Sequence, residues 1–136
     1  MKRFMLALAL IVCVWGCSTI QENYTFADGT YKGSFQREII WQPTDTSTVT
    51  LRFSGNTWSG SSSKPYYPAL CKGTYSIIGD TIIFTNECAW TANFDWTLIL
   101  SGKYKIKIKS DSIEISKDYR SAASDTQVDR YKLKRQ

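Results

Sequence analysis

The chain has 136 residues, with 17 lysines and arginines against 12 aspartates and glutamates, no histidine and 14% aromatic residues. This length fits one domain, and the aromatic content argues against disorder. The lack of histidine excludes Ser-His-Asp and Cys-His catalysis, histidine-ligated zinc or haem, and pH switching by an imidazole. We therefore expect a small folded domain that is not an enzyme and that holds no metal and no cofactor.

The chain begins with a positively charged head and an apolar segment. Lys2 and Arg3 precede twelve uncharged positions, residues 4–15, which is too short for a membrane-spanning helix of about 20 residues. Such a segment is typical of a secretory signal peptide. It ends in Val14-Trp15-Gly16-Cys17, which resembles the lipobox of bacterial lipoproteins. The resemblance implies a signal peptide over residues 1–16, acylation of Cys17 and a lipid anchor in the cell envelope, with the outer membrane as the expected location.

The alternative is an ordinary cleaved signal peptide with an incidental cysteine. In either case residues 17–27 read as a short tether and residues 28–136 as the folded domain. Removal of residues 1–16 leaves 15 basic residues against 12 acidic ones. This excess is too small to indicate binding to nucleic acid.

The folded domain alternates apolar and polar residues with a period of two, which is typical of half-buried β-strands. Turn residues separate the alternating segments, and residues 59–68 and 117–127 are expected loops. The pattern predicts an all-β domain of eight or nine antiparallel strands in up-and-down order. The alternating segments include residues 31–35, 49–53, 73–77, 82–84, 96–100, 104–108, 113–115 and 131–133.

One hairpin makes the sharpest prediction. A two-residue turn at residues 79–80, which begins with glycine, pairs Tyr75 with Phe84. The same register places Cys71 opposite Cys88 on a non-hydrogen-bonded pair, where the two Cα atoms come close enough for a disulfide. An exported protein meets the oxidising compartment that such a bond requires. We predict a disulfide between these two cysteines.

Antiparallel strands with one apolar face close into a barrel or stack as a sandwich, and up-and-down order favours the barrel. Several segments resemble the lipocalin-like lipoproteins of Bacteroides-type bacteria; they are residues 28–33, 71–77, 86–90 and 129–133. The resemblance implies a lipocalin-like barrel, in which Tyr31 and a basic residue of the last strand, Arg130 or Arg135, close the base.

A set of aromatic residues falls mostly on the predicted inner face. These residues either fill the barrel or line a pocket for a small apolar ligand. Arg37 shares the phase of the inward residues, so we expect it to point inward at the barrel mouth. There it would either orient a ligand carboxylate or phosphate or lie at the rim with its charged head in water. The candidate ligand-binding residues are Tyr31, Phe35, Arg37, Phe53, Trp58, Tyr75, Phe84 and Trp96.

The alternative function is a protein-binding or hydrolase-inhibitor module that acts through loops at residues 59–70 and 88–95. Trp90 and Phe94 are its candidate anchors, because exposed aromatic residues are frequent at interfaces. The same segment contains two acids, Glu87 and Asp95, and a pair of carboxylates is the catalytic arrangement of glycosidases. The predicted register turns Glu87 outward, so we expect no catalysis.

Four lysines of the stripe KYKIKIK, residues 103–109, lie on one face of a predicted strand. Contact with anionic lipid head groups is one interpretation of this stripe. We favour the interpretation that these lysines form a solvated face that limits aggregation between sheets.

Overall fold

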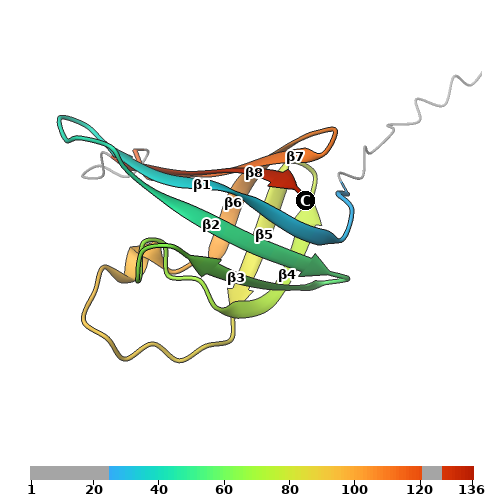
Figure 1. Cartoon of the computed structure of the whole chain (residues 1–136), viewed down its shortest axis with the longest axis horizontal. Helices are drawn as coiled ribbons and strands as arrows, with labels where there is room; N and C mark the ends of the chain where they lie inside the picture. Colours follow the sequence, from blue (N-terminus) through green and yellow to red (C-terminus); the bar gives the residue numbers. More distant parts are fainter. Residues whose placement is uncertain (1–24, 121–126) are drawn as a thin grey trace, which may run out of the picture.

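Eight antiparallel strands close into one barrel in the computed structural model (Figure 1). The structure describes residues 25–120 and 127–136, so Cys17 and the predicted signal peptide lie outside the described residues. The strands are β1 (Gly29–Ile39), β2 (Asp45–Ser54), β3 (Thr57–Ser62), β4 (Lys72–Ile78), β5 (Thr81–Asn86), β6 (Gly102–Lys109), β7 (Ser112–Asp118) and β8 (Gln127–Arg135).

Each strand pairs with its neighbour in sequence, and β1 also pairs with β8, which closes the barrel. The period-two pattern produces this arrangement, because every second residue faces the interior. In β2, for example, Val49, Leu51 and Phe53 are buried, whereas Thr48 and Arg52 are exposed. The prediction of an all-β, up-and-down barrel is confirmed, with eight strands.

The β4–β5 hairpin has the predicted register. Gly79 adopts a φ of 58°, which glycine tolerates at a tight turn. Tyr75 pairs with Phe84, and the disulfide between Cys71 and Cys88 is present, with its Cα atoms 6.4 Å apart. This disulfide therefore joins the chain where it enters β4 to the start of the long loop, residues 87–101.

Two predicted boundaries are wrong. Residues 96–100 do not form a strand, because the Asp95 side chain accepts a hydrogen bond from the Thr97 backbone N–H and starts a 3-10 helix, η1 (Trp96–Leu98). The predicted loop at residues 59–68 begins as strand instead, since β3 continues to Ser62. Gly60 packs closely there, because a Cβ atom would lie 2.5 Å from the Leu51 side chain and 3.1 Å from the Thr50 carbonyl oxygen.

The barrel interior is filled by side chains. Tyr31, Phe35, Phe53, Trp58 and Phe84 are at most 2% exposed, and they pack against one another and against aliphatic residues. Edge-to-face contacts link them, such as the pair formed by Trp58 and Phe84, whose ring centroids are 5.5 Å apart. Of the two interpretations of the inner aromatic residues, the structure favours the filled core.

Two further predicted inner residues differ from this set. Tyr75 is only partly buried, although its ring packs 5.1 Å from that of Phe53. Trp96 is 56% exposed, so its predicted place on the inner face is wrong. The reason is that Trp96 belongs to η1, where the period of two does not apply.

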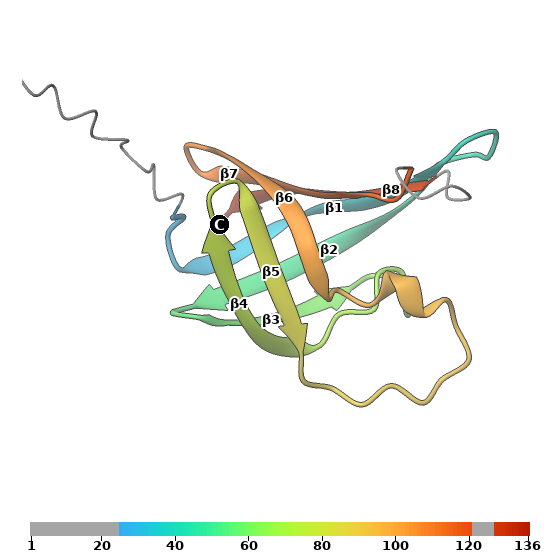
Figure 2. The ribbon, with the colours of Figure 1, turned by 180° about the vertical axis from the view of Figure 1, so that it is seen from behind.

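The two ends of the barrel differ. At one end the chain enters β1 and the C-terminus leaves β8; the long loop of residues 87–101 and the β1–β2 connection lie at the other (Figures 1 and 2). At the first end Arg135 donates a hydrogen bond to the Asp28 carbonyl over 2.8 Å. Arg130 instead pairs with Glu114. The resemblance suggested Arg130 or Arg135 as the basic residue near Tyr31. In the structure Arg135 is the one that lies beside Tyr31, since the two residues are paired across β1 and β8.

Candidate functional site

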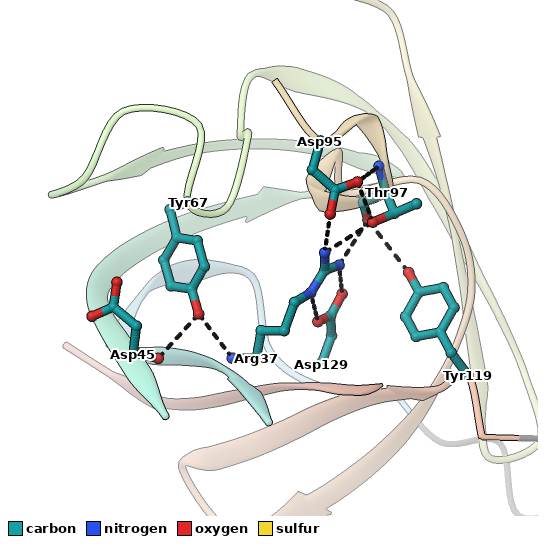
Figure 3. Close-up of polar contacts among 7 residues, drawn as sticks. All are labelled: Arg37, Asp45, Tyr67, Asp95, Thr97, Tyr119 and Asp129. Carbon is teal, nitrogen blue, oxygen red and sulfur yellow. Dashed lines mark hydrogen bonds and ion pairs between the residues drawn. The ribbon is translucent and has the colours of Figure 1, made fainter. Parts of the chain in front are cut away.

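A buried ion pair connects the first and last strands at the loop end of the barrel. Arg37 of β1 and Asp129 of β8 are paired in register and are 4% and 1% exposed. Arg37 Nε donates to Asp129 Oδ1 over 2.6 Å, and Nη2 donates to Oδ2 over 2.7 Å. The pair is thus bidentate, the strongest geometry for an arginine and a carboxylate (Figure 3).

Two residues from the long loop complete the coordination of Arg37. Its Nη1 donates to Asp95 Oδ2 over 2.7 Å and to Thr97 Oγ1 over 2.9 Å, while Nη2 donates to the Thr97 carbonyl over 3.2 Å. All five N–H donors of the guanidinium therefore have acceptors. We call Arg37, Asp95, Thr97 and Asp129 the arginine network.

The electrostatics of the arginine network follow from this geometry. Burial lowers the pKa of Arg37, but the hydrogen bond to Asp129 and its charge outweigh burial, and the pKa is raised. Burial raises the pKa of Asp95, but hydrogen bonds from Thr97 and the charge of Arg37 outweigh it, and the pKa is lowered. Burial also raises the pKa of Asp129, with Arg37 opposing the shift. Both carboxylates are thus bound to a cation, which suits a structural role.

The inward direction predicted for Arg37 agrees with the structure, but its donors already bind protein groups. Tyr67 further covers this region: its hydroxyl accepts a hydrogen bond from the Arg37 backbone N–H over 3.3 Å and donates to the Asp45 carbonyl over 3.2 Å. The Tyr67 ring also packs on Phe35, with centroids 5.2 Å apart. The role of Arg37 in orienting a ligand stays a prediction.

An open cavity of about 360 Å³ lies next to the arginine network, at the end of β5 and between the long loop and β7. Its lining includes the rings of Trp90, Trp96 and Tyr119 and the polar side chains of Asn86 and Lys117. We call these five residues the aromatic pocket. Cys88 also lines the cavity, so the disulfide holds the start of the long loop at its edge.

Two residues of the aromatic pocket carry hydrogen-bond donors without acceptors. Asn86 Nδ2 and Trp90 Nε1 are buried and have no hydrogen-bond partner among the described residues. An unsatisfied buried donor costs about 1–3 kcal/mol, so such groups call for an explanation. Both residues line the cavity, so a ligand acceptor that reached these N–H groups would provide the missing partners.

Lys117 adds a cation to the aromatic pocket. Its ammonium lies 5.0 Å from the ring centroid of Tyr119 and 5.2 Å from that of Tyr104, which are cation–π distances. Burial lowers the pKa of Lys117, with the charge of Asp129 opposing the shift. Burial also raises the pKa of Tyr119 to about 12, so its hydroxyl is a neutral donor at physiological pH; it binds the Thr97 carbonyl over 3.3 Å.

A second aromatic group lies on the outside of the two loops. Tyr66 stacks on Phe94 with ring centroids 4.5 Å apart, and Phe94 also contacts Trp90 and Trp96. Trp90 and Phe94 are only partly exposed because of these contacts, whereas Tyr66 and Trp96 are 42% and 56% exposed. The two predicted partner loops thus form one surface, and its most exposed rings are Tyr66 and Trp96.

Sequence reasoning placed Trp90 and Trp96 in candidate sites but missed Asn86, Lys117, Tyr119 and Asp129. A signal for two of these was present: Lys117 continues the inward phase of Ile113 and Ile115, and Asp129 shares the phase of Tyr131. A charged residue in an inward phase needs a partner or a function. Asn86 and Tyr119 carry no such signal, since they lie where strands end.

Comparison of the chain with family models, with curated proteins and with solved structures found no match. Within residues 25–120 and 127–136, no helix is long and apolar enough to cross a membrane. The fold and the site therefore define the class by themselves: a closed eight-stranded antiparallel barrel with a filled interior and an aromatic pocket beside its disulfide.

Proposed function

We propose that this protein is a lipid-anchored lipoprotein of the bacterial cell envelope that binds a small ligand in the aromatic pocket. The ligand would have a flat apolar body and a carboxylate, sulfonate or similar acceptor group. This proposal keeps the binding role inferred from the sequence but moves the site from the barrel interior to the loop end. Binding rather than catalysis is proposed, because both carboxylates of the arginine network are held by Arg37.

The observation that carries the proposal is the set of donors at one cavity. Asn86 and Trp90 contribute buried N–H groups without partners, and Lys117 contributes an ammonium. The flanking rings offer apolar contact area to a flat molecule, as in many small-molecule sites. A cavity of about 360 Å³ accommodates a molecule of two or three fused or linked rings.

The dye 8-anilinonaphthalene-1-sulfonate is a suitable probe, because it joins flat rings to a sulfonate. We expect its fluorescence to rise on binding to the protein at micromolar to millimolar concentrations. Lys117→Gln removes the cation and should weaken binding about tenfold, which corresponds to one charge-assisted hydrogen bond of about 1.4 kcal/mol. Trp96→Ala removes one wall and should weaken binding to a similar extent.

The matched control is Trp41→Ala, since Trp41 is 96% exposed and does not line the pocket. This variant should bind the dye as the unmodified protein does. Equal affinity for the dye in the Lys117→Gln and Trp96→Ala variants would refute the aromatic pocket as the site.

The second candidate function is the protein-binding or inhibitor module. The surface formed by Tyr66, Trp90, Phe94 and Trp96 favours it, because clustered rings with partial exposure are typical of interface anchors. Tyr66→Ala and Phe94→Ala separate the two candidates, since neither residue lines the aromatic pocket. Loss of a co-purifying envelope protein from these variants, with dye binding retained, would support this module over the ligand-binding proposal.

The lipid anchor has its own test. We propose that Cys17 is acylated, as its lipobox implies, and that each buried methylene of the acyl chains adds about 0.8 kcal/mol to anchoring. The full chain should sediment with membranes and label with a fatty-acid analogue. Cys17→Ala should abolish the labelling; a Cys17→Ala chain that still labels would contradict the anchor.

A further inference from the structure

A second concave site lies on the outer face of the barrel, away from the aromatic pocket. It is a groove of about 770 Å³ over β1, β8, β7 and β6. Five lysines and one acidic residue line it, together with small residues at positions 33, 34, 48 and 112. We call it the lysine groove; its lysines are Lys32, Lys107, Lys109, Lys132 and Lys134.

The strand register explains why these lysines meet. One row of paired residues runs across four strands. Lys32 of β1 pairs with Lys134 of β8. Ser112 of β7 then pairs with Lys134 on one side and with Lys109 of β6 on the other. The neighbouring row runs in the same way from Lys132 to Lys107 across Glu114. Two rows of outward residues thus place all five lysines on one continuous surface.

The positive charge of the lysine groove is poorly neutralised by the protein. Glu114, its only acidic lining residue, accepts a hydrogen bond from Arg130 over 2.9 Å. Of the five lysines, Lys134 alone forms an ion pair with a described residue, with 3.5 Å to Asp111. Lys32 and Lys134 are also direct cross-strand neighbours, an arrangement of like charges that destabilises a sheet. A bound anion would relieve this repulsion.

We propose that the lysine groove binds the anionic head groups of the membrane to which the protein is attached. Its lysines and the hydroxyls of Ser34 and Thr48 are donors suited to phosphate oxygens. This interpretation of the lysines differs from that of a purely solvated face, because the groove also holds three lysines outside the KYKIKIK stripe, namely Lys32, Lys132 and Lys134.

The position of the lysine groove supports a membrane as the source of the anion. The groove lies toward the barrel end where the chain enters β1. The end of β8 and the β6–β7 turn meet at this end, because the Arg135 backbone N–H donates a hydrogen bond to the Asp111 carbonyl. Cys17 lies eight residues before Thr25, the first described residue, a span of at most about 28 Å when extended. This step rests on the lipid anchor proposed above, which would hold the groove close to the bilayer.

The experiment uses residues 18–136 without the anchor, so that the groove is tested independently of Cys17. This part contains the whole core, whose residues lie between positions 26 and 133. Sucrose-loaded vesicles of phosphatidylcholine with 30% phosphatidylglycerol (mole fraction, roughly the anionic content of a charged leaflet) should sediment the protein at low salt. Vesicles of phosphatidylcholine alone should not.

A triple variant tests the groove. Lys32→Gln, Lys107→Gln and Lys132→Gln together should lower the partition coefficient about 100-fold, since each lysine near an anionic surface contributes about fivefold. The control triple variant, Lys64→Gln, Lys72→Gln and Lys103→Gln, changes the net charge equally outside the groove. It should lower partitioning less than about threefold, from the general loss of charge alone.

Three outcomes would overturn the proposal. The first is absence of binding to the anionic vesicles. The second is an equal loss in both triple variants, which would show a net-charge effect without a site. The third is full displacement by millimolar inorganic phosphate at constant ionic strength, which would make the groove a site for free oxyanions. None of these measurements involves dye binding at the aromatic pocket, so the two proposals fail separately.

Discussion

The buried ion pair between Arg37 and Asp129 allows a quantitative prediction about stability. The substitution Asp129→Asn keeps the shape of the side chain but removes its charge. Arg37 then stays buried, with Asp95, whose side chain is 52% exposed, as its remaining counter-ion. Removal of one partner of a buried pair costs about 3–5 kcal/mol. Because Asp95 still compensates part of the charge, we expect about 3 kcal/mol, a large part of the 5–15 kcal/mol typical of a domain.

Urea unfolding followed by tryptophan fluorescence measures this loss. With a slope of about 1.5 kcal/mol/M, the midpoint should fall by about 2 M. The control is Asp80→Asn, which removes an exposed pair with Lys105 at 3.3 Å, where both side chains are more than half exposed. Such a pair contributes about 0–1 kcal/mol.

A double variant tests the physical cause. Arg37→Met combined with Asp129→Leu removes both charges, so it should regain part of the stability that Asp129→Asn loses. A loss below 1 kcal/mol for Asp129→Asn, at an unchanged slope of the urea dependence, would refute the reasoning, and so would an equal loss for Asp80→Asn. The reasoning would also fail if the double variant lost more stability than the Arg37→Met and Asp129→Leu single variants lose in sum.

Three further predictions concern other parts of the barrel. Gly33→Ala should lower stability by at least about 1–3 kcal/mol in urea unfolding, because its Cβ would lie 1.9 Å from the Lys132 carbonyl oxygen where β1 crosses β8; an unchanged midpoint would contradict this close approach. Replacement of Cys71 and Cys88 by serine should cost about 3 kcal/mol, the chain-entropy value for their separation of 17 residues; alkylation of both thiols without reductant would show that the bond is absent. Burial lowers the pKa of Lys117 from the usual 10.5, so as the pH rises the ammonium is lost at a lower pH than that of an exposed lysine. Dye affinity should therefore fall in alkaline buffer, and a pH-independent affinity, or the same fall in Lys117→Gln, would exclude Lys117 as the cause.

Local patterns in the sequence determined the fold class. Alternation with a period of two encodes a strand with one buried face, and short turns between such segments lead to antiparallel neighbours. The disulfide followed in the same way, because a two-residue turn at Gly79 sets the register over the whole hairpin. These predictions rest on residues close to one another in the sequence, for which local geometry leaves few alternatives.

The period-two pattern gave wrong predictions where a side-chain contact decides the local structure. The segment around Trp96 has the alternation of a strand, but Asp95 binds the backbone of Thr97 and starts a 3-10 turn instead. At the serine-rich end of β3, Gly60 lies opposite Leu51 of the neighbouring strand, whose side chain leaves little room for a larger residue. In both cases the deciding contact is set by hydrogen bonding or packing and not by the period.

Only the tertiary structure decided which residues form the candidate sites. Arg37 and Asp129 are 92 residues apart and meet because β1 pairs with β8 when the barrel closes. Whether the inner aromatic residues leave a hollow depends on the sum of their volumes and on the tilt of the strands, which no single segment contains. The aromatic pocket and the lysine groove likewise join residues from several strands and loops, so they exist only once the chain has folded.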